Sequence, residues 1–315
     1  SSNELEKIEP VQFNSRMVMA SVDFYATQEK VVYDPFLKPK LYQVNQDGII
    51  RFFRSMAKHS SLWDYNLKLL LNLRVTNKLN DWGFYQLIKN ASETIFENSN
   101  EQRLFSWYML LKSGYRVKVG YDENEVFLLI PSIQKIYKVL HLKGTEKEFY
   151  IFDTSKNEIK TIQTYEREYP GSERYFSFIL NDLINLGGDI IKHELKFKDY
   201  ELTFEFYKNE IDFMNSYPHC ELSTYFLSSM SERNLRVLDN MFMPMFKGKS
   251  ETEKVNILLH FCHHAFKYQT DQEQFGKERY FFADESLFYP YNDCEDRSII
   301  LAKLIKRYTG LESIG

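Results

Sequence analysis

Cys294 is the residue of this 315-residue chain whose type and neighbours best suit covalent chemistry. Asn292 and Asp293 come immediately before it, and both residue types are favoured at the N-cap of a helix. An apolar pattern of helical spacing follows and stops at Gly310. Cys294 therefore falls in the first turn of a predicted helix. It lies seven residues before Leu301, so we expect it on the apolar, inward-facing side of that helix.

A cysteine in the first turn of a helix has two chemical advantages. The helix N-terminus carries a partial positive charge, which favours the thiolate. The backbone N–H groups of the first turn have no partner inside the helix and can stabilise an oxyanion. A core cysteine that happens to lie near a helix end fits the same spacing, because buried free cysteines are common. The pattern alone leaves both alternatives open, a nucleophile and a structural thiol.

Several segments before and after Cys294 form a larger pattern. They are Gln274-Phe275-Gly276-Lys277-Glu278-Arg279, Phe281-Phe282-Ala283-Asp284-Glu285 and Tyr291-Asn292-Asp293-Cys294-Glu295-Asp296, flanked by Ala265-Phe266-Lys267-Tyr268 and Tyr308-Thr309-Gly310-Leu311. This pattern closely resembles bacterial transglutaminase-like cysteine peptidases, in which an Asp-Cys-Glu-Asp stretch opens the nucleophile helix. The resemblance covers residues 230–315 and extends more loosely to the N-terminal part, through Phe24-Tyr25, Tyr33-Asp34-Pro35 and Asn80-Asp81-Trp82.

The resemblance implies acyl transfer with Cys294 as the nucleophile, through a thioester intermediate that water or an amine then attacks. It also implies a histidine base on a strand after the helix, oriented by an aspartate on the next strand. All seven histidines precede Cys294, and Gly315 lies only 21 residues after it. We therefore expect the catalytic His and Asp beyond Gly315, and we expect the chain that ends at Gly315 to be inactive by itself.

Three functions follow as alternatives. The first is hydrolysis of peptide or amide bonds in a peptide, protein or peptidoglycan-like substrate. The second is a protein cross-linking transferase on the same scaffold, and the third is a non-catalytic binding or scaffold protein of the bacterial cell envelope. The long members that the chain resembles are exported, which implies the bacterial periplasm or cell surface, with a cytoplasmic location as the alternative. The opening segment 1–6 is polar, so any signal peptide is expected to have been removed.

Composition excludes several classes of partner. The net charge is −4 and no basic block occurs, so nucleic acid is not expected as a partner. No apolar run approaches the roughly 18 residues that a membrane span requires. The three cysteines are widely spaced without a CxxC pair, which favours three free thiols over a disulfide framework. We expect no cofactor.

Two groups of side chains could bind a metal, and for both we expect none. His260 and His264 have the i, i+4 spacing of zinc sites, but Phe261 stands where a zinc protease carries its glutamate. A polar helix face explains these histidines. Asp293, Glu295 and Asp296 could bind a cation, and the alternative is that these first-turn acids complement the helix dipole.

The predicted elements indicate an α+β fold, with helices packed on antiparallel sheets, and the resemblance implies a papain- and transglutaminase-like topology. We divide the chain into an N-terminal α+β domain (1–188), a β-rich connecting segment (189–228) and the first part of a transglutaminase-like domain (229–315). Helices are expected after Asp64, Asp81 and Asn98, over 172–186, and from Ser231, Ser250 and Asp293. Strands are expected over 22–25, 31–35, 115–121, 125–130, 134–140, 148–152 and 220–227, with a hairpin over 193–207 that turns near 198–199.

A possible repeat relates the two halves. Asn98 lies 16 residues before Gly114, and Cys294 lies 16 residues before Gly310. In this register the first half is a degenerate copy in which Asn98 takes the place of the nucleophile and Asp153 alone matches the acid. An ordinary unit of a helix followed by a meander would give the same spacing by chance.

Overall fold

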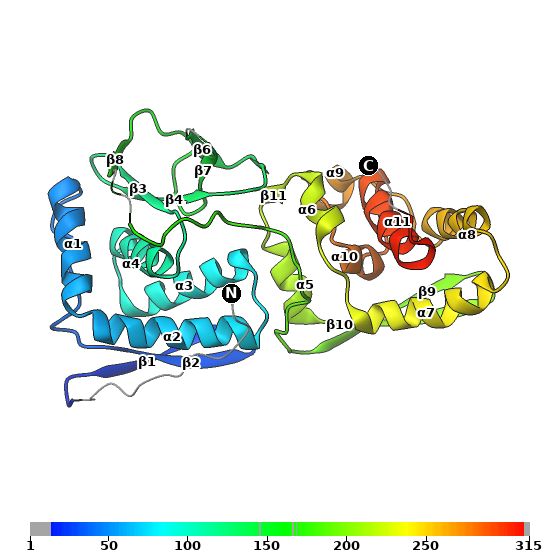
Figure 1. Cartoon of the computed structure of the whole chain (residues 1–315), viewed down its shortest axis with the longest axis horizontal. Helices are drawn as coiled ribbons and strands as arrows, with labels where there is room; N and C mark the ends of the chain where they lie inside the picture. Colours follow the sequence, from blue (N-terminus) through cyan, green and yellow to red (C-terminus); the bar gives the residue numbers. More distant parts are fainter. Residues whose placement is uncertain (1–13, 145, 166, 168, 312–315) are drawn as a thin grey trace. The chain divides into compact units, whose positions relative to one another are not determined.

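The computed structural model describes residues 14–144, 146–165, 167 and 169–311, which form two compact units (Figure 1). The units are Ser1–Phe178 and Ile179–Gly315, so the division falls ten residues before the predicted boundary at 188. The second unit contains both the predicted connecting segment and residues 229–315. Each unit combines helices with antiparallel strands, which confirms the α+β prediction. The polar opening segment 1–6 lies outside the described residues.

The first unit opens with a hairpin of β1 (Val18–Phe24) and β2 (Thr27–Tyr33), which turns at Tyr25 with a φ of 54°. Four helices follow in this part of the described chain: α1 (Gln46–Lys58), α2 (Ser60–Thr76), α3 (Asp81–Ile95) and α4 (Ser99–Lys112). The side chains of Asn45, Asn80 and Asn98 cap α1, α3 and α4 by accepting backbone N–H groups of the first turn. Helix α1 was not predicted.

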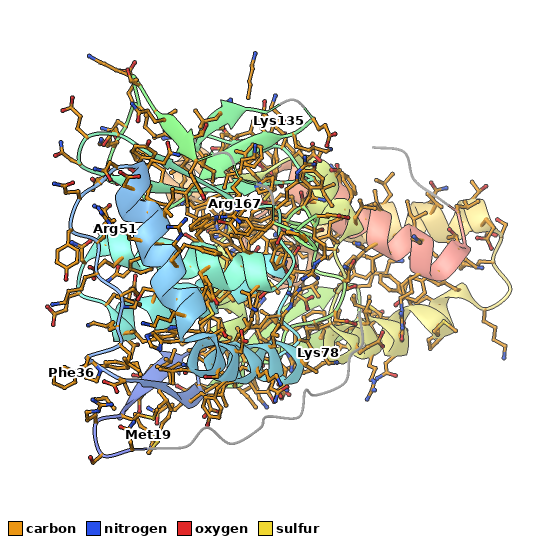
Figure 2. All side chains as sticks on the ribbon, turned by 60° about the vertical axis from the view of Figure 1, so that its left-hand side comes forward. Met19, Phe36, Arg51, Lys78, Lys135 and Arg167 are labelled. Atoms are coloured by element: carbon orange, nitrogen blue, oxygen red, sulfur yellow. The ribbon has the colours of Figure 1, made fainter. Side chains whose placement is uncertain are left out.

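Met19 and Phe36 project from the surface near the hairpin (Figure 2), with 59% and 80% of their surface exposed.

The sheet of the first unit is antiparallel, in the order β6-β7-β4-β3-β8. Its strands are β3 (Lys118–Tyr121), β4 (Val126–Pro131), β6 (Leu140–Lys143), β7 (Glu148–Ile151) and β8 (Gln163–Tyr165), and β5 (Ile136–Tyr137) lies outside it. The strands after Gly114 were expected to form an antiparallel meander, in which each strand pairs with the next along the chain. This expectation was wrong, because β7 pairs with β4 and β6 pairs only with β7 in this sheet. After β4 the chain leaves the sheet at Ser132, which instead forms a bridge with Phe176. Helix α4 packs against β3 and β4.

The helix predicted over 172–186 was wrong. These residues form no helix, and Arg174 and Phe176 bridge to residues of the first unit as extended chain does. Phe176, Phe178 and Leu180 are all buried at a spacing of two. Alternate burial is the pattern of an extended chain, whereas a helix would bury every third or fourth residue.

The second unit opens with a hairpin of β9 (Ile190–Phe197) and β10 (Tyr200–Tyr207), which confirms the predicted turn at Lys198 and Asp199. The elements that follow are α5 (Lys208–Asn215), β11 (His219–Cys220), α6 (Leu222–Leu227), α7 (Glu232–Phe246), α8 (Glu251–His264), α9 (Asp271–Phe275), α10 (Ala283–Phe288) and α11 (Cys294–Thr309). The predicted strand over 220–227 was wrong beyond Cys220. Cys220, Thr224 and Tyr225 are buried, and this spacing of four and five suits the helical turn that forms there.

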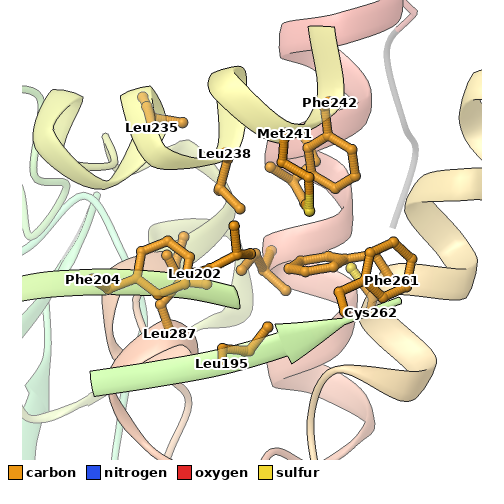
Figure 3. Packing of buried hydrophobic residues seen from close by; sticks show 14 of the residues in the cluster. Leu195, Leu202, Phe204, Leu235, Leu238, Met241, Phe242, Phe261, Cys262 and Leu287 are labelled. Atoms are coloured by element: carbon orange, nitrogen blue, oxygen red, sulfur yellow. The ribbon is translucent and has the colours of Figure 1, made fainter. Parts of the chain in front are cut away.

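A single apolar cluster holds the elements of the second unit together (Figure 3). Leu195, Leu202 and Phe204 of the hairpin face α7, which contributes Leu238 and Phe242. Helices α8, α10 and α11 add Phe261, Cys262, Leu287, Ile300 and Leu304 to the same cluster. Because α8 and α11 both pack into this cluster, the core fixes where the N-terminus of α11 lies relative to the end of α8.

Candidate functional site

Cys294 is the first residue of α11, as the sequence predicted. Asp293 is the N-cap, and its carboxylate accepts the backbone N–H of Asp296 at 3.0 Å. The carboxylate of Asp296 in turn accepts the backbone N–H of Asp293 at 3.4 Å, which completes a capping box. Gly310 ends the helix in the left-handed conformation with a φ of 69°. The backbone N–H of Cys294 has no hydrogen-bond partner among the described residues.

The side chain of Cys294 is exposed, which corrects the prediction that it faces inward. The buried face of α11 is formed by Asp296, Ile299, Ile300 and Leu304. Leu301, from which the orientation was predicted, is only partly buried and lies at the flank of that face. Cys294 precedes Ile300 by six residues, which corresponds to about 240° around the helix axis. The thiol therefore lies on the solvent side, where a substrate can reach it.

The other two cysteines are buried, and all three are free, as predicted. Burial raises the pKa of the Cys220 thiol above its ordinary value. Burial also raises the pKa of the Cys262 thiol, to about 12. Neither is available as a nucleophile, which leaves Cys294 as the accessible thiol.

Tyr268 lies close enough to Cys294 for the two side chains to influence each other electrostatically. The side chain of Tyr268 is 57% exposed. The negative charge that Cys294 carries as a thiolate is the largest cause that raises the pKa of the Tyr268 phenol, followed by loss of contact with water. The phenol is therefore protonated in the neutral pH range, and its proton is available to a hydrogen-bond acceptor beside Cys294.

Backbone hydrogen bonds fix the segment that carries Tyr268 beside the segment that precedes α11. Lys267 donates its N–H to the carbonyl of Pro290 at 3.2 Å, and its carbonyl accepts the N–H of Asn292 at 2.9 Å. These bonds form a parallel bridge between Lys267 and Tyr291. The segment that starts at Lys267 therefore runs beside the segment that starts at Tyr291. This brings Tyr268 near the start of α11.

Three buried carboxylates gather on the other side of the same helix start. Asp271, Asp293 and Asp296 each offer an oxygen atom, and these oxygens all lie within 4.8 Å of one another. Burial raises the pKa of Asp271 to about 6 and that of Asp293 above its ordinary value. Burial and the adjacent charge of Asp293 raise the pKa of Asp296 to about 9. Oxygen ligands of this kind suit a hard cation, so in the described part of the chain this is the group that could hold one.

The three acids that gather here are not the three considered from the sequence, which were Asp293, Glu295 and Asp296. Glu295 is exposed and takes no part, whereas Asp271, from the first turn of α9, takes its place. Asp271 accepts the backbone N–H of Arg279 at 2.7 Å, and Asp296 accepts that of Phe281 at 2.8 Å. The prediction that Asp293 and Asp296 complement the helix N-terminus is confirmed by their capping bonds. The contribution of Asp271 had no sequence signal, because 22 residues separate it from Asp293.

The histidines of the second unit have their contacts elsewhere. His260 and His264 are exposed and their rings stack with centroids 3.9 Å apart. Within the described residues no third histidine, cysteine or carboxylate joins them as a possible metal group. The Nδ1 atom of His193 lies 2.7 Å from the carbonyl oxygen of Leu287, and the ring of His219 packs on Tyr280. None of these contacts involves Cys294, so the location of the catalytic base beyond Gly315 stays a prediction.

In the first unit, Asn98 was the expected counterpart of Cys294, but it lies one position earlier relative to its helix than Cys294 does. Asn98 is the N-cap of α4 and accepts the N–H groups of Asn100 and Glu101, so its structural position is that of Asp293 rather than of Cys294. Asp153 forms ion pairs with Lys89 at 3.6 Å and Arg103 at 3.8 Å. The first unit contains no cysteine. The expected packing of this helix on a sheet is confirmed, and the origin of the unit as a degenerate copy stays a prediction.

Taken together, the residues at the start of α11 can support nucleophilic addition by a thiol. Cys294 is accessible, the Tyr268 phenol is in its vicinity, and its backbone N–H is free to donate to a ligand. These are the groups that addition to a carbonyl requires apart from the base. None of the helices in the described part of the chain is both long and apolar enough to cross a bilayer.

Comparison of the chain with models of known protein families found no match, and comparisons with curated proteins and with solved structures found none either.

Proposed function

We propose that this protein is a thiol acyl-transfer enzyme with Cys294 as its nucleophile, and that its main reaction is hydrolysis of peptide or amide bonds. The observation that carries the proposal is the exposed thiol at the first position of α11. A buried structural cysteine, which was the alternative in the sequence, would not be exposed. The resemblance of 230–315 to transglutaminase-like cysteine peptidases supports the same reaction and a peptide, protein or peptidoglycan-like substrate in the cell envelope.

The proposed reaction has two stages, acylation of Cys294 and hydrolysis of the resulting thioester. The Cys294 thiolate adds to the carbonyl carbon of the substrate, and the π electrons of the carbonyl move to its oxygen. Collapse of this tetrahedral species restores the carbonyl and breaks the C–N bond, so the leaving amine must receive a proton. Water then attacks the thioester carbonyl and the thiol of Cys294 is released. A histidine beyond Gly315 is our proposed carrier of the proton that leaves the thiol and reaches the amine.

We also propose the finer fold assignment, in which the second unit is the first part of a transglutaminase-like domain. Supporting this, α11 opens with Asp-Cys-Glu-Asp and packs against α8 in one core. The hairpin of β9 and β10 packs into that core before the helix.

An activated acyl donor tests the nucleophile without requiring the missing proton donor, because a nitrophenolate or thiolate leaves unprotonated. The 315-residue chain is incubated with a p-nitrophenyl ester of an acylated amino acid, and the modified residue is located by mass spectrometry. We expect one acyl group, on Cys294, and none on the Cys294→Ala variant. Cys220→Ala and Cys262→Ala remove a thiol without touching the site and serve as matched controls. Acylation at another residue, or equal acylation of Cys294→Ala, would show that the nucleophile lies elsewhere.

The two alternative functions are separated by the fate of the acyl group. A cross-linking transferase would pass it to an added primary amine faster than to water, and product analysis with a dansylated diamine measures that ratio. A scaffold protein would be acylated on Cys294 no faster than a free thiol in solution. The first unit, which has no cysteine, fits a binding role beside a catalytic second unit.

A further inference from the structure

Two histidine rings lie against each other at the end of α8. His260 and His264 are both exposed, and their rings stack with centroids 3.9 Å apart and planes inclined by 18°. Residues four apart are neighbours on one face of a helix, so the backbone itself holds the two rings together. A polar helix face, the explanation expected from the sequence, accounts for the exposure of these histidines but not for the contact between their rings.

The hydrogen bonding of His264 defines which of its nitrogens can bind a metal. Its Nδ1 atom lies 2.9 Å from the backbone carbonyl oxygen of His260. A carbonyl oxygen only accepts hydrogen bonds, so Nδ1 carries the proton and Nε2 carries the lone pair. Histidines that bind metals have their second nitrogen hydrogen-bonded in this way, which fixes the tautomer and the orientation of the ring.

The surroundings of His260 favour its neutral form. The ring of Phe197, from the hairpin of β9 and β10, packs beside it with centroids 5.7 Å apart. Loss of contact with water lowers the pKa of His260, and the charges of His264, Lys198 and His263 lower it further. Since a metal binds only deprotonated imidazole, each effect that removes the proton favours metal binding.

We propose that His260 and His264 together bind one divalent copper ion through Nε2 of His264 and a ring nitrogen of His260. The number of ligands selects the metal. Zinc sites use three or four protein ligands, and no third histidine, cysteine or carboxylate joins the pair in the part of the chain that the structure describes. Cu²⁺ has the highest affinity among the divalent first-row ions and accepts nitrogen ligands with water in a tetragonal arrangement.

The stacked rings must turn before they share an ion, because a metal lies in the plane of the imidazole that binds it. Both side chains are exposed, so this rotation displaces no core residue. The partial negative charge at the C-terminus of α8 also favours a bound cation. The ion joins two successive turns of α8, shortly before the bridge between Lys267 and Tyr291, and so stabilises the end of the helix.

The experiment uses the 315-residue chain with Cys294→Ala, because an exposed thiol is itself a metal ligand. Cu²⁺ is titrated at neutral pH against a competing chromogenic chelator, and electron paramagnetic resonance counts the nitrogen ligands. We expect one ion per chain with two nitrogen ligands, and weaker binding of Zn²⁺. His260→Asn and His264→Asn should each lower the affinity for Cu²⁺ at least about tenfold, since even loss of a group that orients a ligand typically costs 10–100-fold.

Two histidines serve as controls. His141→Asn removes an exposed histidine from β6 in the first unit and should leave the affinity unchanged. His263→Asn should also leave it unchanged, although the His263 ring lies 5.1 Å from that of His264. Circular dichroism confirms that each variant is folded.

Three results would overturn the proposal. The first is an unchanged affinity in His260→Asn and His264→Asn. The second is a resonance spectrum with oxygen ligands alone, which would place the ion on the acids Asp271, Asp293 and Asp296 instead. The third is an equal loss of affinity in His263→Asn, which would exclude a site of two ligands. None of these results bears on the proposed acyl transfer, because the chain that is tested lacks Cys294.

Discussion

Solvent exposure separates Cys294 from the two other thiols, and this difference has a direct chemical consequence. Alkylation requires the thiolate and an open path to the sulfur. Cys220 and Cys262 have neither, because both are buried and burial raises the pKa of each. For Cys262 the rise from 9.0 to about 12 reduces the thiolate fraction roughly a thousandfold at neutral pH.

We predict that iodoacetamide modifies the native protein at one position. Cys294 should react within minutes at neutral pH, whereas Cys220 and Cys262 should react only after denaturation. Peptide mapping at timed intervals, in buffer and in urea, measures the three rates separately. Rapid native modification of Cys262 would contradict its placement in the core, and slow modification of Cys294 would contradict its exposure.

For single residues, the sequence predicted the position of Cys294 but not its surroundings. The N-cap residues Asn292 and Asp293 were sufficient to place the thiol in the first helical turn. Its outward orientation was missed because Leu301 marks the flank of the buried face and not its centre. The proximity of Tyr268 could not be predicted, because it arises from a backbone bridge between residues 24 positions apart, which no local periodicity records.

At the scale of helices and strands, acidic side chains from the N-termini of α9 and α11 lie close together. Asp271 is the first residue of α9, and Asp293 and Asp296 belong to the first turn of α11. Each carboxylate complements its own helix dipole, yet together they place three acidic groups in one buried volume. Burial raises the pKa of all three, so each carboxyl holds its proton to a higher pH in the folded protein than in water.

This grouping predicts that the second unit loses stability as pH rises. An unfolded aspartate releases its proton near its ordinary pKa of 3.8, whereas folded Asp271 and Asp296 keep theirs up to about 6 and about 9. The folded state thus binds more protons between these values, and the free energy of unfolding falls as pH rises through that window. Urea denaturation at pH 5, 7 and 9, in the presence of a chelator that removes divalent cations, should show the decline.

Asp271→Asn provides the comparison for this experiment. An asparagine oxygen can still accept the N–H of Arg279, but the group no longer titrates. The variant should lose less stability between pH 5 and 7 than the unmodified chain, and titrating groups that do not interact with Asp271 cancel in this difference. Identical pH profiles for the two proteins would show that Asp271 ionises in the folded state as freely as in water.

In the second unit, the helices that were predicted are longer than those that were missed. Helices α7, α8 and α11 have 15, 14 and 16 residues and begin after Ser231, Ser250 and Asp293, so both their caps and their apolar periods are visible in the sequence. Helices α9 and α10 have only 5 and 6 residues, too few to establish a period. They are held by side chains distant in sequence, such as Asp284 of α10, which accepts the N–H groups of Ser231 and Asn234.

For the whole molecule, the distribution of two residue types provides a separate probe of each unit. All three tryptophans (Trp63, Trp82 and Trp107) belong to the first unit, and all three cysteines belong to the second. Tryptophan fluorescence therefore reports unfolding of the first unit. The accessibility of Cys220 and Cys262 to an alkylating pulse reports unfolding of the second.

Each unit also contains an ion pair that is at least partly buried. In the second unit Glu285 is fully buried, pairs with Arg279 and accepts the N–H of Phe282 at 3.0 Å. In the first unit Asp81 pairs with Arg74 at 2.7 Å and accepts the hydroxyl of Tyr115. Breaking a fully buried pair typically costs about 3–5 kcal/mol. The two arginines left behind here are 14% and 21% exposed, so we expect a smaller but still clear loss of stability.

We predict that Glu285→Ala and Asp81→Ala destabilise different units. Because each unit has its own buried core, Glu285→Ala should lower the urea midpoint for thiol alkylation and leave the fluorescence midpoint in place, and Asp81→Ala should do the reverse. Glu251→Ala is the matched control for the first, since Glu251 is also a first-turn helical glutamate but its ion pair with Lys254 is exposed and contributes about 0–1 kcal/mol. If both midpoints moved together in both variants, the chain would unfold as one cooperative body. In that case neither unit could be assigned a stability of its own, and the pH dependence predicted for Asp271 would have to appear in the tryptophan signal as well.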